Sequence, residues 1–251
     1  MGLERLDILS EFLGTLVLIL LGNGVVYSVS GKRMFGNQPG KWVVIILGWG
    51  LAVFAGVIVS QSLGGSAHLN PAVTVFDLVS SKFNDPLKLV YIPVQLLGAM
   101  AGQIVLNFIN WKHIQETDLW SVRGSHCTGP AYSGKEKASV FNFAYELVGT
   151  MLLVGLVLAF SKGSNVSSLA TFGPIPVTLI VIAIGASLGS STGYAINPAR
   201  DFGPRVIYYL TERLLMKNRK QEFVGGNWSY SWIPVLAPLT GGLLIGLFSL
   251  M

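Results

Sequence analysis

The sequence predicts an all-α membrane protein with six transmembrane helices and two re-entrant half-helices, arranged as an inverted repeat. The first observation behind this prediction is composition: 51% of the 251 residues are hydrophobic and only 12% are charged, whereas about a quarter of residues in soluble domains are charged. The second is a set of six long apolar stretches, and the third is a short motif present once in each half. We expect residues 1–251 to form a single domain.

Six apolar stretches are long enough to cross a bilayer, because a hydrocarbon core of about 30 Å requires roughly 20 apolar residues in a helix. The first stretch has spanning length and no small-residue cleavage site, so we interpret it as a retained helix and not as a signal peptide. The predicted crossings are residues 7–29, 41–62, 86–110, 138–160, 175–193 and 231–250, joined by polar connections at 30–40, 111–137, 161–174 and 211–230.

Two shorter apolar stretches, 70–80 and 197–210, each begin at an Asn-Pro-Ala triplet. Asn is a favoured helix N-cap, and Pro is favoured at the first helical position because its missing N–H is not needed there. Each triplet therefore predicts a helix start, and ten residues of helix cover about 15 Å, half of the membrane. The triplets are Asn70-Pro71-Ala72 and Asn197-Pro198-Ala199.

The two halves of the chain, roughly 1–125 and 126–251, repeat each other. A Glu-x-x-Gly-Thr pattern begins at Glu11 in the first predicted crossing and again at Glu146 in the fourth. Each half has an odd number of crossings, so the second half enters the membrane inverted. The half-helices then meet N-terminus to N-terminus near the midplane, an arrangement typical of channels and transporters with a substrate path at the repeat interface.

Several classes of protein are excluded by what the sequence lacks. The net charge of +5 is spread over loops without a basic cluster, so we expect no nucleic-acid partner. The single cysteine, Cys127, falls in a polar connection and cannot form an intrachain disulfide. The sequence has no nucleotide-binding loop, metal-ligand cluster or nucleophile–base constellation, and we therefore expect no cofactor, no bound metal and no enzymatic activity.

The segments around the two triplets, residues 66–74 and 193–204, resemble the two signature loops of the major intrinsic protein family, the aquaporins. Asp201, directly after Arg200, resembles the aquaglyceroporin or glycerol-facilitator branch. The likeness extends from Glu11 to the last predicted helix. It implies an aquaporin-like bundle, a homotetramer with one pore in each protomer, and a multi-pass plasma-membrane protein with cytoplasmic termini.

The loop charges favour the opposite orientation. More Lys and Arg residues fall in the loops across the membrane from the termini than on the side of the termini. The positive-inside rule then places the termini outside. The charge count and the resemblance disagree, and we adopt the orientation that the resemblance implies.

Two opposed half-helices predict a pore that rejects ions. A helix N-terminus behaves like about half a positive charge, and two such ends at the midplane repel cations, as is described for aquaporin-type pores. Asn70 and Asn197 can direct carboxamide N–H groups at a passing hydroxyl or water oxygen. The alternative is that both residues serve only as helix caps.

Arg200 follows the second Asn by three residues, which places it about 4.5 Å from the midplane. An arginine at that depth faces a water path or a partner such as Asp201. The resemblance implies that the narrowest ring of the pore is formed by Trp49, Gly185, Tyr194 and Arg200. It also implies that Asp201 leaves this ring wider than in water-only channels. Trp49 has an alternative interpretation as an interfacial-belt tryptophan. The chain departs from the family pattern at Tyr194, where Phe is usual, and by one extra residue between Trp49 and the first triplet.

Three more polar residues lie within the predicted membrane region. His68 is in the loop that leads to the first half-helix, where the backbone carbonyls of residues 66–69 can accept from a solute; either a pore-lining or a structural role fits it. Glu11 and Glu146 are intramembrane carboxylates, which are functional by default. The resemblance implies instead that they accept N–H bonds from the re-entrant loops.

The leading functional prediction is passive conduction of small uncharged solutes, glycerol first, together with water, through a pore that excludes ions and protons. Within the channel class, the hydroxyl of Tyr194 can shift the preference toward water, urea, dihydroxyacetone, hydrogen peroxide or undissociated lactic acid. An alternative from another class is a secondary active transporter, which also uses inverted repeats and requires Glu11 or Glu146 to cycle protons.

Overall fold

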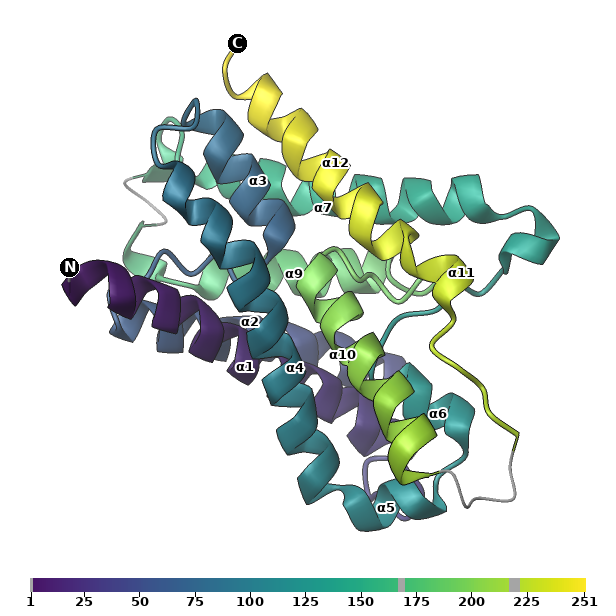
Figure 1. Cartoon of the computed structure of the whole chain (residues 1–251). Helices are drawn as coiled ribbons and strands as arrows, with labels where there is room; N and C mark the ends of the chain where they lie inside the picture. The colour runs from purple at the N-terminus through teal and green to yellow at the C-terminus, as the bar shows by residue number, and fades with distance from the viewer. Residues whose placement is uncertain (1, 167–169, 217–221) are drawn as a thin grey trace.

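The structure is a computed structural model that describes residues 2–166, 170–216 and 222–251. In these ranges every regular element is a helix and none is a strand, as predicted (Figure 1). Five helical segments have the length and apolar composition to cross a membrane. They contain α1 (Gly2–Ser30), α2 (Lys41–Ser62), α4 (Tyr91–Ile109), α7 (Ser139–Phe160) and α12 (Ile233–Phe248). Short turns, η1 (Pro86–Val90) and α11 (Trp228–Ser231), lead into α4 and α12.

The fifth predicted crossing, residues 175–193, is shorter than expected. Its helix, α9, covers only Ile175–Ser187, and these 13 residues rise by about 20 Å. The next residues, 189–193, read Gly-Ser-Ser-Thr-Gly, and such residues favour turns. Gly193 has a φ of 82°, which glycine adopts readily. The helix therefore ends early, and the residues after it lead back into the protein toward the second half-helix.

Both half-helices begin where the triplets predict. Asn70 caps α3 (Pro71–Ser80) and Asn197 caps α10 (Pro198–Leu210), each with a Pro in the first helical turn. Neither helix is long enough to cross a hydrocarbon core of about 30 Å. Each therefore spans only part of the membrane, and each packs against membrane-length helices, α3 against α12 and α10 against α4.

The helix packing has the symmetry of an inverted repeat. α1 packs against α2 and α4, and in the second half α7 packs against α9 and α12. Each half-helix contacts the last long helix of the other half, α3 with α12 and α10 with α4. Glycines permit these close approaches: a Cβ at Gly242 of α12 would lie 2.2 Å from the Ala72 carbonyl oxygen of α3. The two halves are therefore interlocked at the centre.

The predicted connection over 111–137 has more structure than a polar loop. It contains α5 (Trp111–Glu116), α6 (Leu119–Gly124) and the turn η2 (Gly134–Glu136). The first two pack on the ends of α1 and α10 in a separate apolar cluster, which consists of Tyr27, Ile114, Leu119, Val122, Tyr208 and Met216. Cys127, expected in an open loop, is buried in this region. Residues 167–169 and 217–221 of two other predicted connections lie outside the described residues.

Candidate functional site

The two half-helices meet at their N-termini through a reciprocal pair of hydrogen bonds. The Asn70 carboxamide nitrogen donates to the Ile196 carbonyl oxygen at 2.9 Å, and that of Asn197 donates to the Leu69 carbonyl oxygen at 2.8 Å. The side-chain oxygen of each Asn accepts backbone N–H groups of its own helix, from Ala72 at 2.9 Å and from Ala199 at 3.0 Å. The opposed helix starts predicted from crossing parity are thus present.

Each asparagine serves as a cap and also faces two cavities. Because a carboxamide nitrogen carries two hydrogens, one N–H of each Asn remains after the bond across the interface. Asn70 and Asn197 line two cavities that lie on either side of them. The other members of the triplets, Pro71, Ala72, Pro198 and Ala199, line neither cavity; Ala72 and Ala199 are buried against neighbouring helices.

The loops that lead to the half-helices have matching backbone strain. The residues one and three positions before each Asn have positive φ: Leu69 (52°) and Ala67 (55°) in the first loop, Ile196 (42°) and Tyr194 (36°) in the second. Such conformations cost about 1–3 kcal/mol each for residues other than glycine. No backbone N–H of the described residues bonds to the carbonyl oxygens of residues 66–68 or 193–195. These oxygens are therefore free to accept from a solute.

Glu11 and Glu146 hold the two strained loops. Glu11 accepts the backbone N–H groups of His68 and Leu69, both at 2.7 Å. Glu146 accepts those of Ala195 at 3.0 Å and Ile196 at 2.8 Å. Both carboxylates are fully buried in the interior of the bundle. They make the backbone contacts that the family resemblance implies, at equivalent positions of the two halves.

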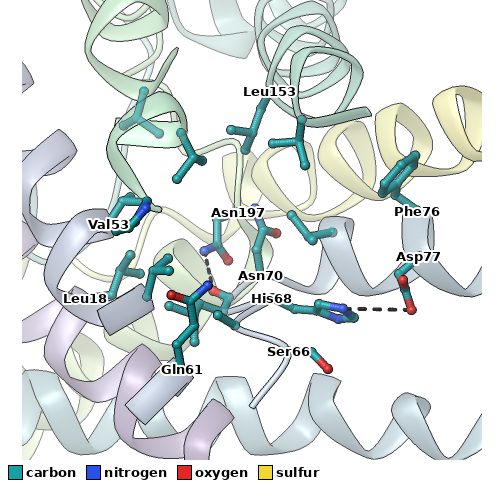
Figure 2. A pocket seen from close by; sticks show the side chains of 18 of the residues that line it. Leu18, Val53, Gln61, Ser66, His68, Asn70, Phe76, Asp77, Leu153 and Asn197 are labelled. Carbon is teal, nitrogen blue, oxygen red and sulfur yellow. Dashed lines mark hydrogen bonds and ion pairs between the residues drawn. The ribbon is translucent and has the colours of Figure 1, made fainter. Parts of the chain in front are cut away.

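His68 lies between the pore and the surface on the side of the termini. Its Nδ1 is 3.1 Å from the Thr74 hydroxyl, and its Nε2 is 3.9 Å from an Asp77 carboxylate oxygen. Asp77 also accepts from Lys88 at 2.9 Å. His68 and Asp77 both line the larger cavity (Figure 2). The histidine therefore has structural partners and also faces the solute path.

The larger cavity, of about 320 Å³, lies on the side of the termini, because α2 ends there and the first re-entrant loop begins there. Figure 2 shows Asn70 and Asn197 side by side among its lining residues, with Leu18, Val53 and Leu153 around them. A second cavity of about 50 Å³ lies beyond the asparagines. The two cavities share Leu18, Val53, Asn70, Leu153, Val181 and Asn197, so they form one path that narrows past the asparagines.

Three of the four predicted ring residues line the narrow cavity. Trp49, Tyr194 and Arg200 are each at most 6% exposed, and the Arg200 guanidinium carbon lies 4.2 Å from the Trp49 ring centroid. Trp49 Nε1, the Tyr194 hydroxyl and Arg200 Nη1 are buried without a hydrogen-bond partner in the described part of the chain. Buried polar atoms are normally paired, so three unpaired groups at one constriction indicate a site for a polar molecule.

Gly185 lies behind the constriction and not in the lining of either cavity. A Cβ at this position would lie 2.8 Å from Cζ of Tyr194, closer than side chains tolerate. Gly185 therefore contributes to the ring indirectly, since the absence of a side chain leaves room for the tyrosine.

Asp201 pairs with Arg205 and not with Arg200. Its Oδ1 accepts from Arg205 Nε at 2.8 Å and Nη2 at 2.7 Å, while its Oδ2 accepts from the Thr128 N–H at 2.8 Å. Asp201 and Arg205 are fully buried, and Asp201 lines neither cavity. The possible Arg200–Asp201 pair is thus wrong, and Asp201 supports the outer loops instead of forming the ring wall.

Arg205 supports the site from behind and was not predicted from the sequence. Its Nη1 donates to the Gly226 carbonyl at 2.7 Å and its Nη2 to the Thr128 carbonyl at 2.9 Å. It therefore joins α10 to two outer loops. Its spacing of four residues from Asp201 is that of a helical ion pair, and this signal was present in the sequence.

A narrowing path between two opposed half-helices, inside a bundle of membrane-length helices, defines a transmembrane solute channel. The family model for the major intrinsic protein matches residues 4–249, and the chain belongs to that family.

Similar proteins cover nearly the whole chain. A "Probable glycerol uptake facilitator protein" of Mycoplasmoides gallisepticum is 48% identical over 97% of this chain and 96% of its own length. "Glycerol uptake facilitator protein 3" of Lactiplantibacillus plantarum is 42% identical over 95% and 93%. Among solved structures, the aquaglyceroporin from Plasmodium falciparum superposes with a TM-score of 0.76 at 30% identity, covering 97% of this chain and 94% of its own.

Proposed function

We propose that this protein conducts small uncharged polar solutes passively across the cell membrane, chiefly glycerol, together with water. The observation that carries the proposal is the constriction of about 50 Å³, where Trp49, Tyr194 and Arg200 present unpaired polar atoms. The apolar side chains of Leu18, Val53, Leu153 and Val181 line the same cavity. A polyol has hydroxyl groups for the polar atoms and a carbon backbone for the apolar side chains.

Conduction requires that the pore replace the hydration of the solute as it advances. At the constriction, Arg200 and Trp49 supply donors, and the Tyr194 hydroxyl can donate or accept. At the centre, the remaining N–H groups of Asn70 and Asn197 donate. The carbonyl oxygens of residues 66–68, which line the larger cavity, and of residues 194 and 195, which line the narrow one, accept on either side. A solute therefore exchanges one set of hydrogen bonds for another without losing all of them at once.

Rejection of cations follows from the charge along the same path. Two helix N-termini meet at the asparagines, each equivalent to about half a positive charge. Arg200 adds a full charge at the constriction, and no carboxylate lines the narrow cavity among the described residues. Asp201, the nearest acid in sequence, is occupied by Arg205. Protons and metal cations therefore meet a positive potential where water is scarcest.

Stopped-flow light scattering on proteoliposomes tests this function directly. Vesicles with the protein should swell in a glycerol gradient faster than protein-free vesicles and should also pass water. Urea, dihydroxyacetone, hydrogen peroxide and lactic acid at low pH are the competing solutes to compare. A vesicle that passes water but not glycerol would contradict the glycerol assignment and leave a water channel.

A secondary active transporter is the alternative class, and the carboxylate contacts argue against it. Glu11 and Glu146 each accept two backbone N–H groups, so protonation would release the loops that form the pore. Accumulation of glycerol against its gradient, driven by a proton gradient, would favour the transporter. Equilibration without accumulation is the expected result, and no chemical change of the solute should accompany it.

We infer the oligomeric state and the membrane location of the protein from its family. Membership in the major intrinsic proteins supports a homotetramer with one pore per protomer, in the plasma membrane, with cytoplasmic termini. Mass measurement of the detergent-purified protein by light scattering should give four chains per particle. A monomer with full glycerol permeability would show that the tetramer is dispensable for conduction.

A further inference from the structure

One face of α2 runs along the solute path and continues outward beyond the constriction. Its residues recur at helical spacing, every three or four positions: Trp42, Ile46, Trp49, Val53, Val57 and Gln61. The last four of these line the cavities. Trp42 begins this row, two helical turns outward from Trp49, or about 10 Å along the axis. It therefore lies on the pore side of α2 beyond the constriction.

Trp42 contacts two members of the predicted ring that belong to other elements. Its indole N–H donates to the Gly185 carbonyl oxygen of α9 at 3.2 Å. Its ring meets the Tyr194 ring edge-on, with centroids 5.9 Å apart and planes at 75°. Edge-to-face aromatic pairs of this geometry are favourable beyond the burial of the two rings. Trp42 thus connects α2, α9 and the second re-entrant loop.

Tyr194 lies in a slot that these contacts complete. A Cβ at Gly185 would lie 2.8 Å from Tyr194 Cζ, and one at Gly189 would lie 2.5 Å from Tyr194 Cδ1. The tyrosine ring therefore lies directly against the backbone of α9 and the turn after it. No hydrogen bond fixes its hydroxyl among the described residues, and its own backbone has a strained φ of 36°. Ring orientation consequently depends on packing, and Trp42 supplies an aromatic contact.

We propose that Trp42 is a positioning residue of the solute filter, which holds the Tyr194 ring against Gly185 and Gly189 and thereby limits the size of solute that passes. The inference rests on the proposed function, because it concerns the selectivity of the same constriction. Trp42 acts through Tyr194 and lines neither cavity itself. Substitution of Trp42 should therefore change the relative permeability to solutes of different size more than it changes the fraction of active protein.

The test compares the permeability of proteoliposomes to glycerol and to a four-carbon polyol, erythritol. Trp42→Ala removes one wall of the slot, so the Tyr194 ring can turn away from the path, and the erythritol-to-glycerol ratio should rise about threefold. Trp42→Phe keeps an aromatic ring but loses the N–H donor to Gly185, and should give a smaller rise. Trp120→Ala is the matched control, because Trp120 is an exposed residue of α6 away from the cavities.

A double variant separates positioning from general stability. In a Tyr194→Ala background the ring is already absent, so Trp42→Ala should cause no further change in the ratio. Equal losses for both solutes, with an unchanged ratio in Trp42→Ala and Trp42→Phe, would overturn the proposal. An additive effect of Trp42→Ala in the Tyr194→Ala background would also overturn it. Failure of the unmodified protein to pass glycerol would instead refute the proposed function.

Discussion

At the scale of single residues, Tyr194 distinguishes the proposed filter. It places a hydroxyl where the resemblance to the family implies a phenylalanine ring. The hydroxyl is buried beside Arg200 and has no partner in the described structure. The constriction therefore carries one more polar group than the resemblance implies.

Replacement of Tyr194 by Phe should raise the glycerol-to-water permeability ratio by about threefold, the worth of one neutral hydrogen bond. The ring and its packing against Trp42 remain, while the group that favours the more polar solute is lost. Stopped-flow swelling and shrinking rates of the same vesicles give the ratio. Tyr132→Phe, at an exposed tyrosine, is the control. An unchanged ratio in Tyr194→Phe would remove this hydroxyl from the filter.

Replacement of Arg200 by Ala should increase proton leak by about tenfold, because the full positive charge at the constriction disappears. The two helix N-termini remain, so exclusion should weaken without vanishing. A pH-sensitive dye inside proteoliposomes measures the leak after an external acid jump. Arg200→Lys keeps the positive charge and should show no increase in proton leak. A leak of the same size in Arg200→Ala and the unmodified protein would count against the electrostatic role.

Most of the filter was expected from the resemblance to the family, whereas its supporting contacts could not be predicted from the sequence. Trp49, Tyr194 and Arg200 do converge on one cavity. Gly185 faces the tyrosine and not the lumen, since a position in a ring does not reveal which atoms reach the path. Trp42 was not predicted as part of the site, because its contacts with Gly185 and Tyr194 join residues that lie far apart in the sequence.

At the scale of elements, the half-helices depend on how their leading loops are held. The helix caps are local and read directly from sequence, because Asn and Pro act on their own next few residues. The strained φ values before each Asn are not local, since Glu11 and Glu146 stabilise them from other helices. The length of α9 and the short helices α5 and α6 were also missed, because turn residues and outer-loop packing outweigh hydrophobic length there.

Glu146→Gln should lower the free energy of unfolding by about 1–3 kcal/mol and reduce permeability to all solutes together. The amide has one acceptor oxygen where the carboxylate has two, so one of the Ala195 and Ile196 N–H groups loses its acceptor. Thermal unfolding in detergent and vesicle swelling measure the two effects. Glu136→Gln, at the exposed turn η2, is the matched control. A stable and fully active Glu146→Gln would mean that the second re-entrant loop keeps its conformation without this carboxylate.

At the scale of the whole molecule, Arg205 fastens the outer surface to the core. It joins α10 to the loop at Thr128 and to the loop at Gly226. Glu212, also fully buried, accepts the N–H groups of Val224 and Gly225 in the second of these loops. The outer loops are therefore held by two buried charges of α10 and the turn that follows it.

Arg205→Met should destabilise the protein by about 3–5 kcal/mol, because it leaves Asp201 buried without its counter-ion. The midpoint of thermal unfolding in detergent measures the loss. Arg33→Ala is the matched control: Arg33 pairs with Glu116 at 3.2 Å, but its side chain is 72% exposed, and surface pairs contribute at most about 1 kcal/mol. Equal effects of the two substitutions would contradict a clamp at Arg205.

The orientation of the protein in the membrane can be measured by labelling single introduced cysteines. Cys127 is the only cysteine, it is 3% exposed, and burial raises the pKa of its thiol to about 11. Cys127 should therefore not react with a membrane-impermeant maleimide. Lys135→Cys, on the loop across the membrane from the termini, should be labelled in intact cells, and Lys162→Cys only after permeabilisation. The reverse pattern would support the positive-inside count.

The reciprocal bonds between Asn70 and Ile196, and between Asn197 and Leu69, also set an order for biosynthesis. The first half of the chain leaves the ribosome and enters the membrane before residues 196 and 197 exist. During that interval the Leu69 carbonyl and the Asn70 amide lack the partners that they have in the finished protein. The middle of the pore thus forms only after most of the second half has been made, and a truncated first half would carry unmatched polar groups.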